Sequence, residues 1–119
     1  MRFKDLGATG LTVTELCVGT SPLADMAVLY GYDVPEQRAV DTIRRAFDGP
    51  INFLDTSNNY GNGNSERRIG EAIAAAGGVP DGFLLATKVD PLPGSTDFSG
   101  SRVYASVAES LERRLSRVS

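Results

Sequence analysis

The chain has 119 residues, of which 41% are hydrophobic and 23% are charged, and its formal net charge is −3. This length holds at most one domain, and the composition is ordinary for a globular protein. The slightly acidic balance gives no basic surface for nucleic acid, no apolar run approaches the roughly 20 residues of a membrane span, and the N-terminus lacks a signal-peptide core. We therefore expect no nucleic-acid and no membrane partner.

Cysteine and histidine usage narrows the chemistry further. Cys17 is the only cysteine, so no intramolecular disulfide can form, and this fits a reducing cytoplasm. Because Cys17 lies in an apolar segment, we expect a packed core thiol and not a nucleophile. The chain has no histidine, which excludes histidine metal sites and histidine-based triads from these residues. The sequence thus predicts a cytoplasmic protein without a metal site.

The first 15 residues predict a β-hairpin. Residues 1–6 and 11–18 are strand-like runs, and the loop between them has glycine at both ends. The second run becomes more apolar at residues 16–18, which we interpret as the first core strand. Residues 21–33 show no clear periodicity of hydrophobic residues, so no helix or strand is predicted there.

Residues 33–47 predict the first helix. Asp33 and Glu36 have the spacing of a capping box. One face of this helix is apolar and carries Val40, Ile43 and Phe47. Residues 48–50 end the helix, and a buried strand is predicted at residues 52–54.

Two further helices and one strand complete the pattern. Ser65 is the predicted cap of the second helix, which ends at Gly77 and Gly78. Its buried stripe is Ile69, Ala72, Ile73 and Ala76. A third strand is predicted at residues 83–89 and a loop at residues 90–100. The stripe of the third helix is Val103, Val107, Leu111, Leu115 and Val118, and Arg113, Arg114 and Arg117 lie near its end. Four arginines are expected on solvated helix faces: Arg67, Arg68, Arg113 and Arg114.

The element order is a hairpin over residues 1–15 followed by three βα units over residues 16–119. Alternation of this kind predicts an α/β fold with a parallel sheet and right-handed crossovers. In such a sheet the carboxyl ends of the strands share one edge. Asp55 and Lys88 lie near two of these ends, and Tyr60 lies in the loop after Asp55.

Asp55, Tyr60 and Lys88 together could transfer a proton to a carbonyl oxygen. A free phenol titrates near pH 10 and is a poor donor at neutral pH, whereas a nearby ammonium stabilises a phenolate. Asp55 would orient Lys88, Lys88 would tune the phenol, and Tyr60 would donate the proton. The alternative is that Tyr60 is a half-buried loop residue and that Asp55 and Lys88 form an ordinary ion pair. Residue types and spacing by themselves favour this alternative.

Four motifs in order resemble the aldo-keto reductase superfamily. Residues 6–14 (LGATGLTVT) resemble its opening hairpin and residues 16–20 (LCVGT) its first barrel strand. Residues 53–61 (FLDTSNNYG), followed by Ser65-Glu66, resemble its main signature, and residues 86–88 (ATK) its lysine strand. A finer likeness, in residues 67–70, 88–90, 97–100 and 110–113, is to the branch of D-threo-aldose 1-dehydrogenases and L-fucose dehydrogenases.

The resemblance implies a function and a set of site residues. Tyr60, Asp55 and Lys88 would be three members of the catalytic tetrad. Gly19, Thr20 and Asp55 would lie beside the nicotinamide of NAD or NADP. The substrate would be a small carbonyl compound or a sugar, and no metal would take part.

The chain also departs from this family. The fourth tetrad member is a histidine, which is absent here, and a TIM barrel needs about 250 residues. We therefore expect the N-terminal part of an incomplete (β/α)8 barrel that is inactive alone and that self-associates through open sheet edges. Its inner face is expected to include Val18, Phe53, Leu54 and Leu85. The alternative function is a non-catalytic half-barrel fragment that needs oligomerisation or a missing C-terminal half.

Overall fold

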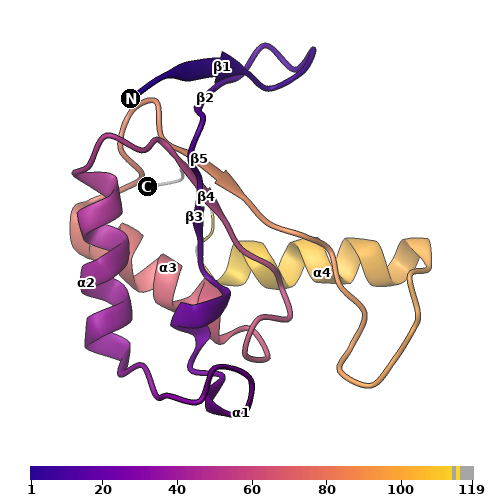
Figure 1. Cartoon of the computed structure of the whole chain (residues 1–119). Coiled ribbons are helices and arrows are strands. Elements are labelled where there is room, and N and C mark those ends of the chain that lie inside the picture. The colour runs from indigo at the N-terminus through magenta and orange to yellow at the C-terminus, as the bar shows by residue number, and fades with distance from the viewer. Residues whose placement is uncertain (114, 116–119) are drawn as a thin grey trace.

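The structure is a computed structural model and describes residues 1–113 and 115. The chain opens with an antiparallel hairpin of β1 (Phe3–Asp5) and β2 (Thr12–Thr14), in which Lys4 pairs with Val13. Figure 1 shows this hairpin at one end of the molecule, beyond the central strands. The predicted hairpin is confirmed.

The central sheet has three short parallel strands in the order β3-β4-β5. These are β3 (Val18–Gly19), β4 (Phe53–Asp55) and β5 (Leu84–Ala86). Val18 pairs with Leu54, and Leu54 pairs with Leu85. The predicted parallel sheet is confirmed, with a helical crossover between each pair of neighbouring strands.

One long helix follows each strand. They are α2 (Glu36–Phe47), α3 (Asn64–Ala76) and α4 (Gly100–Glu112). Residues 21–33, which show no clear hydrophobic periodicity, contain two short turns of helix, η1 (Ser21–Ala24) and α1 (Ala27–Tyr30). Figure 1 shows α2 and α3 on one side of the strands and α4 pointing away from them.

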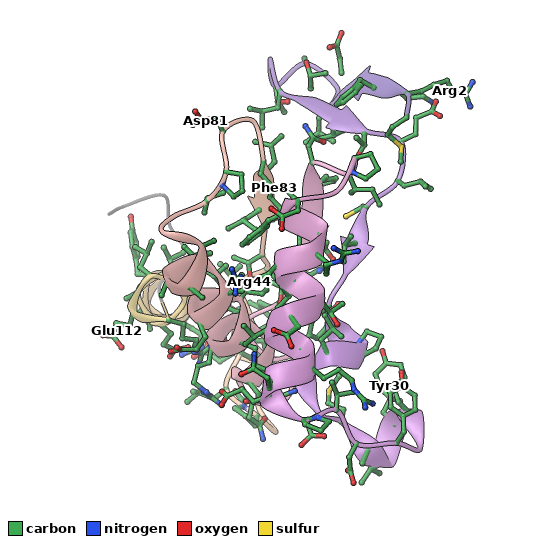
Figure 2. The ribbon with its side chains drawn as sticks, turned by 90° about the vertical axis from the view of Figure 1, so that its left-hand side faces the viewer. Arg2, Tyr30, Arg44, Asp81, Phe83 and Glu112 are labelled. Carbon is green, nitrogen blue, oxygen red and sulfur yellow. The ribbon has the colours of Figure 1, made fainter. Side chains whose placement is uncertain are left out.

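An apolar core fills the space between α2, α3 and the sheet. Ile43, Leu54 and Ile69 are each 0% exposed. The rings of Phe47 and Phe83 meet edge to face with their centroids 4.9 Å apart, and Figure 2 shows Phe83 beside α2. The predicted stripes of these two helices are confirmed except at Ala76, which is exposed at the end of α3.

The two faces of the sheet differ from expectation. Leu54 belongs to the apolar core, and Val18 and Leu85 pack against that core from neighbouring register positions. Because successive strand residues point to opposite faces, Phe53 and Asp55 lie on the face away from this core. The expectation that Val18, Phe53, Leu54 and Leu85 share an inner face is therefore wrong.

The start of α2 does not use the predicted capping box. Pro35 is the N-cap residue, and no side chain caps the helix there, so Asp33 does not have the predicted role. The carboxylate of Asp25 instead accepts a hydrogen bond from the Val34 backbone N–H at 2.8 Å. Asp25 thus fixes the chain just before α2, and the helix itself begins without a side-chain cap.

Ser65 is likewise not the cap of α3. Gly63 is the N-cap residue, with a φ of 90° that favours glycine, and Ser65 is buried inside the first turn. At the other end Gly77 adopts a left-handed conformation and its N–H donates to the Ala74 carbonyl, as predicted for a helix stop.

Helix α4 buries a different face from the predicted one. Its buried residues are Arg102, Ser106 and Ser110, whereas Val107 and Leu111 are 44% and 55% exposed. The helix is oriented by hydrogen bonds to loops and to α3, and these bonds override its apolar period. Val118, Arg114 and Arg117, which were assigned to the same helix, lie outside the described residues.

Candidate active site

Asp55 and Lys88 enter the site from neighbouring strands. Asp55 ends β4 and pairs with Gly19 of β3 and Ala86 of β5. Lys88 lies two residues beyond Ala86 and so faces the same side as Asp55. The Lys88 Nζ donates to Asp55 Oδ2 at 2.7 Å and to the Thr56 carbonyl at 2.8 Å. The ammonium is thus tied both to a carboxylate and to the end of β4.

Tyr60 reaches this ion pair from the loop after β4. The Lys88 Nζ lies over its ring, 5.2 Å from the centroid, which is within the range of a cation–π contact. The first turn of α3 holds the loop, because the Ser65 N–H donates to the Tyr60 carbonyl at 3.1 Å. The predicted convergence of Asp55, Tyr60 and Lys88 is confirmed, and their catalytic roles stay predictions.

The electrostatics keep Lys88 charged. Partial burial lowers the pKa of Lys88, but the hydrogen bond and charge of Asp55, followed by contributions from Tyr60, outweigh that effect and leave this pKa above its ordinary value. Lys88 is consequently a cation at neutral pH. A fixed cation at the face of a tyrosine can stabilise negative charge that develops on the phenol oxygen.

A glycine is required directly after Tyr60. Gly61 has a φ of 60°, and a Cβ on it would lie 2.6 Å from the Ala24 carbonyl oxygen of η1. The same oxygen accepts a hydrogen bond from Asn64 Nδ2 at 2.8 Å. A larger residue at 61 would force the Tyr60 loop away from η1. Glycine at this position is therefore explained by the packing of the loop.

Gly19 and Thr20 lie beside Asp55 in different ways. No heavy atom lies within 4 Å of the position that a Cβ on Gly19 would occupy, so this residue borders open space. Thr20 is 0% exposed; its hydroxyl donates to the Asp55 carbonyl at 3.0 Å and accepts from Ser65 Oγ at 2.9 Å. Thr20 therefore supports the end of β4. The assignment of Gly19, Thr20 and Asp55 to cofactor binding stays a prediction.

Asn58 and Asn59 serve the loop. Asn58 is 2% exposed, and its Nδ2 donates to the Ser106 carbonyl at 3.2 Å and to Glu109 Oε2 at 2.9 Å. Asn59 donates from Nδ2 to the Pro91 carbonyl at 2.9 Å. Both side chains bind the Tyr60 loop to the segment after β5 and to α4, so turn and loop structure account for them.

Cys17 is not the packed core thiol that the sequence predicted. It is an exposed free cysteine and shares the open face of the sheet with Gly19 and Asp55. Partial burial and then the charge of Asp55 raise the pKa of the Cys17 thiol. It is therefore a protonated, weakly nucleophilic thiol at neutral pH.

Two arginines expected on solvated faces are instead structural. Arg68 is 5% exposed and donates to the Leu23 and Val34 carbonyls, each at 2.7 Å. Arg113 pairs with Glu66 at 2.7 Å. Arg67 is exposed as expected, and Arg114 lies outside the described residues.

The sequence reasoning missed the central buried acid of this region. Glu66 is 0% exposed, and its carboxylate contacts Thr87, Ser110 and Arg113. Only its place in the Ser65-Glu66 motif could have drawn attention to it, because a glutamate in a first helical turn is usually solvated.

The segment from η1 to α1 forms a groove wall near the Tyr60 loop. Met26 lines an open groove together with Asn59 and Gly61. The Tyr30 hydroxyl donates to Ser21 Oγ at 2.7 Å, and Figure 2 shows Tyr30 at the far end of the molecule from Arg2. Ordinary packing accounts for Tyr30, whereas Met26 remains exposed to the groove.

The described part of the chain has neither a membrane-spanning helix nor a cluster of metal ligands. None of its helices has the length and apolar character needed to cross a membrane. Within the same residues no group of three or more histidine, cysteine, aspartate or glutamate side chains is arranged to hold a metal ion.

The family follows from comparison with known proteins. The model of the Aldo/keto reductase family matches residues 15–115. The chain belongs to the aldo/keto reductase family. An L-galactose dehydrogenase of Arabidopsis thaliana is 40% identical over 113 residues, which are 95% of this chain and 34% of that protein. An oxidoreductase of Bacillus subtilis is 35% identical over 127 residues, covering 99% of this chain and 36% of the relative.

Solved aldo-keto reductases share the fold. The holo form of an aldo-keto reductase from Bacillus halodurans is 28% identical with a TM-score of 0.75, and the match covers 95% of this chain and 36% of that one. A glycerol dehydrogenase from Gluconobacter oxydans is 26% identical with a TM-score of 0.71, and the match covers 93% of this chain and 35% of that one. The chain thus spans about a third of the relatives' length, and the described residues are an N-terminal part of a TIM barrel without closure.

Proposed function

We propose that this chain supplies three catalytic groups of an NAD(P)-dependent oxidoreductase. The observation that carries the proposal is the Lys88–Asp55 ion pair at 2.7 Å, with the same ammonium over the Tyr60 ring. Family membership and the oxidoreductases among the relatives support it. The remaining strands of a closed barrel would have to come from outside these 119 residues.

The three groups divide the proton transfer between them. In the reducing direction the Tyr60 hydroxyl gives its proton to the carbonyl oxygen while a hydride reaches the carbonyl carbon. In the oxidising direction the Tyr60 oxygen accepts a proton from the substrate hydroxyl. Lys88 stabilises the phenolate in both directions, and Asp55 keeps Lys88 charged and oriented. The bound nicotinamide supplies or accepts the hydride.

The residues on the open face fit the nicotinamide end of such a cofactor. Gly19 leaves open space beside Asp55, so a flat ring could approach the backbone closely. Asp55 offers carboxylate oxygens on the same face. Thr20 would act indirectly by holding the Asp55 carbonyl through its buried hydroxyl.

We propose an aldose as the substrate class. The finer motif likeness is to aldose-oxidising enzymes, and one relative is named L-galactose dehydrogenase. Hydride would then leave the sugar C1 carbon, and Tyr60 would accept the proton of its hydroxyl. A small carbonyl compound, reduced at its carbonyl carbon with the proton from Tyr60, is the other substrate class that these groups would serve.

The test is a chimera in which this chain replaces the matching third of the Arabidopsis L-galactose dehydrogenase. We expect the chimera to oxidise L-galactose and Tyr60→Phe to lower turnover by about 10²–10⁴-fold, because the ring stays and the proton donor is lost. Cofactor binding, followed by NAD(P)H fluorescence, should change little. A Tyr60→Phe chimera with unchanged turnover would reject the role of Tyr60.

A non-catalytic, self-associating module is the second candidate. The apolar side chains that α4 leaves exposed favour it, since Tyr104, Val107 and Leu111 are 82%, 44% and 55% exposed. Among the described residues β5 also has no strand on its outer side. We expect the 119-residue chain alone to form dimers or larger species and to reduce no aldehyde. Size exclusion with light scattering, and an NAD(P)H assay on the same fractions, checks both points; an active monomer would overturn this expectation.

A further inference from the structure

The residue before Lys88 is anchored on the opposite side of the strand. Thr87 Oγ1 donates a hydrogen bond to Glu66 Oε1 of α3 at 2.6 Å. Successive residues of an extended strand point to opposite faces, so fixing Thr87 toward α3 turns Lys88 toward Asp55. The two chain segments stay paired beyond the ends of β4 and β5, because the Thr56 N–H donates to the Ala86 carbonyl at 2.8 Å and the Asn58 N–H donates to the Lys88 carbonyl at 3.3 Å.

The acceptor of this bond is itself immobilised. The Glu66 carboxylate is 0% exposed, accepts from Ser110 Oγ at 2.8 Å and pairs with Arg113 at 2.7 Å. The same nitrogen of Arg113 donates to the Asn58 carbonyl at 3.0 Å, in the loop that carries Tyr60. Glu66 is consequently connected both to the Lys88 strand and to the Tyr60 loop.

We propose that Glu66 is a positioning residue for Lys88, acting through the Thr87 hydroxyl. The inference rests on the proposed catalytic role of Lys88, while its geometric content stands apart from any activity. Lys88 benefits from such support, since its side chain is 47% exposed and its ionic partner Asp55 is 38% exposed, which leaves the Thr56 carbonyl as its other anchor. Exposed ion pairs contribute little by themselves.

Releasing Thr87 would change the surroundings of the Lys88 ammonium in a definite direction. The groups that face Lys88 are Asp55, Tyr60 and the more distant Cys17. The contact with Asp55 favours the ammonium form, so a strand end that swings away loses this effect and the pKa of Lys88 falls. A purely structural role for Thr87 and Glu66 would lower stability and leave this pKa where it is.

The experiment measures how readily Lys88 is acylated across a range of pH. The chain has only two lysines, so competitive labelling with an amine-reactive anhydride, read by peptide mass spectrometry, reports Lys88 against Lys4 in the same sample. It works at low concentration and in any oligomeric state. The variants are Thr87→Val, which removes the hydroxyl with the same shape, Thr87→Ser, which restores it, and Ser110→Ala, which removes a different hydroxyl from the same carboxylate.

We expect Thr87→Val to shift the Lys88 labelling curve to lower pH and to raise its rate several-fold near neutral pH. Thr87→Ser and Ser110→Ala should leave the curve in place. Glu66→Gln, which keeps an oxygen acceptor, should shift it by less than Thr87→Val. An unshifted curve in folded Thr87→Val, or an equal shift in Ser110→Ala, would overturn the proposal. If the labelling results hold but the chimera is inactive, the proposed function fails and the positioning role of Glu66 stands.

Discussion

Helices α2 and α4 are similar in length but are held to the rest of the molecule by different forces. The buried residues of α2 are all apolar, namely Ala39, Val40, Ile43 and Phe47. Those of α4 are all polar, namely Arg102, Ser106 and Ser110. Apolar burial is roughly proportional to area and tolerates small shifts, whereas hydrogen-bonded groups need fixed distances and angles.

The polar contacts of α4 lie next to the candidate site. The two terminal nitrogens of Arg102 donate hydrogen bonds to the Glu109 carboxylate at 2.7 and 2.8 Å. Its Nε donates to the Asp90 carbonyl at 2.8 Å. Asp90 accepts in turn from the Asn59 N–H at 3.0 Å, and from the Ser57 hydroxyl. The directional contacts thus lie beside the Tyr60 loop and the segment after β5, whereas the apolar contacts lie between α2, α3 and the sheet.

The largest effect is expected from Arg113→Met. The substitution leaves the Glu66 carboxylate buried without its cation, and loss of one partner of a buried pair costs about 3–5 kcal/mol. Urea unfolding at one protein concentration measures it. Arg67→Met is the matched control on α3, since Arg67 is exposed and its substitution should stay within about 0.5 kcal/mol. Equal losses for the two variants would show that the polar contacts of Glu66 contribute nothing.

Leu54→Ala and Leu111→Ala compare identical changes on the apolar and polar sides. Leu54 is 0% exposed, so its truncation should lower the unfolding free energy by about 2–5 kcal/mol. Leu111 is 55% exposed, so its truncation should leave the urea midpoint of dilute protein nearly unchanged and weaken self-association instead. A large loss at Leu111 in dilute protein would mean that the stripe predicted from the sequence is buried after all.

The smallest effect concerns pH. The hydrogen bonds from Arg102 and Asn58 hold the pKa of Glu109 at about 2, below its ordinary 4.5. Because the folded state binds this proton less readily, the contribution to stability is present above about pH 5 and is lost as pH falls toward 2. Glu109→Gln should therefore flatten that part of a plot of the urea midpoint against pH. A variant with the wild-type slope would assign the acid sensitivity to other carboxylates.

The features of the fold that could be predicted from the sequence are those determined by hydrophobic periodicity and by the order of strands and helices along the chain. Val40, Ile43 and Phe47 recur at helical spacing, and alternation of strands and helices implies a parallel sheet, which brings Asp55 and Lys88 to one edge. The prediction that the apolar stripe of α4 is buried was wrong, because hydrogen bonds of Ser106 and Ser110 to distant partners outweigh the apolar periodicity of the helix. Asp33 and Ser65 are not caps because the N-cap position depends on the incoming backbone, which places Pro35 at the start of α2 and a left-handed Gly63 at the start of α3.

The exposed position of Cys17 has a practical consequence. A single thiol on the open face, beside Gly19 and Asp55, is a natural attachment point for a fluorophore or a spin label. Because the pKa of this thiol is raised, coupling would proceed best in mildly alkaline buffer. A label there would sit at the mouth of the proposed nicotinamide site. Its spectrum would therefore report a second polypeptide or a bound ring arriving at that face, without any need for turnover.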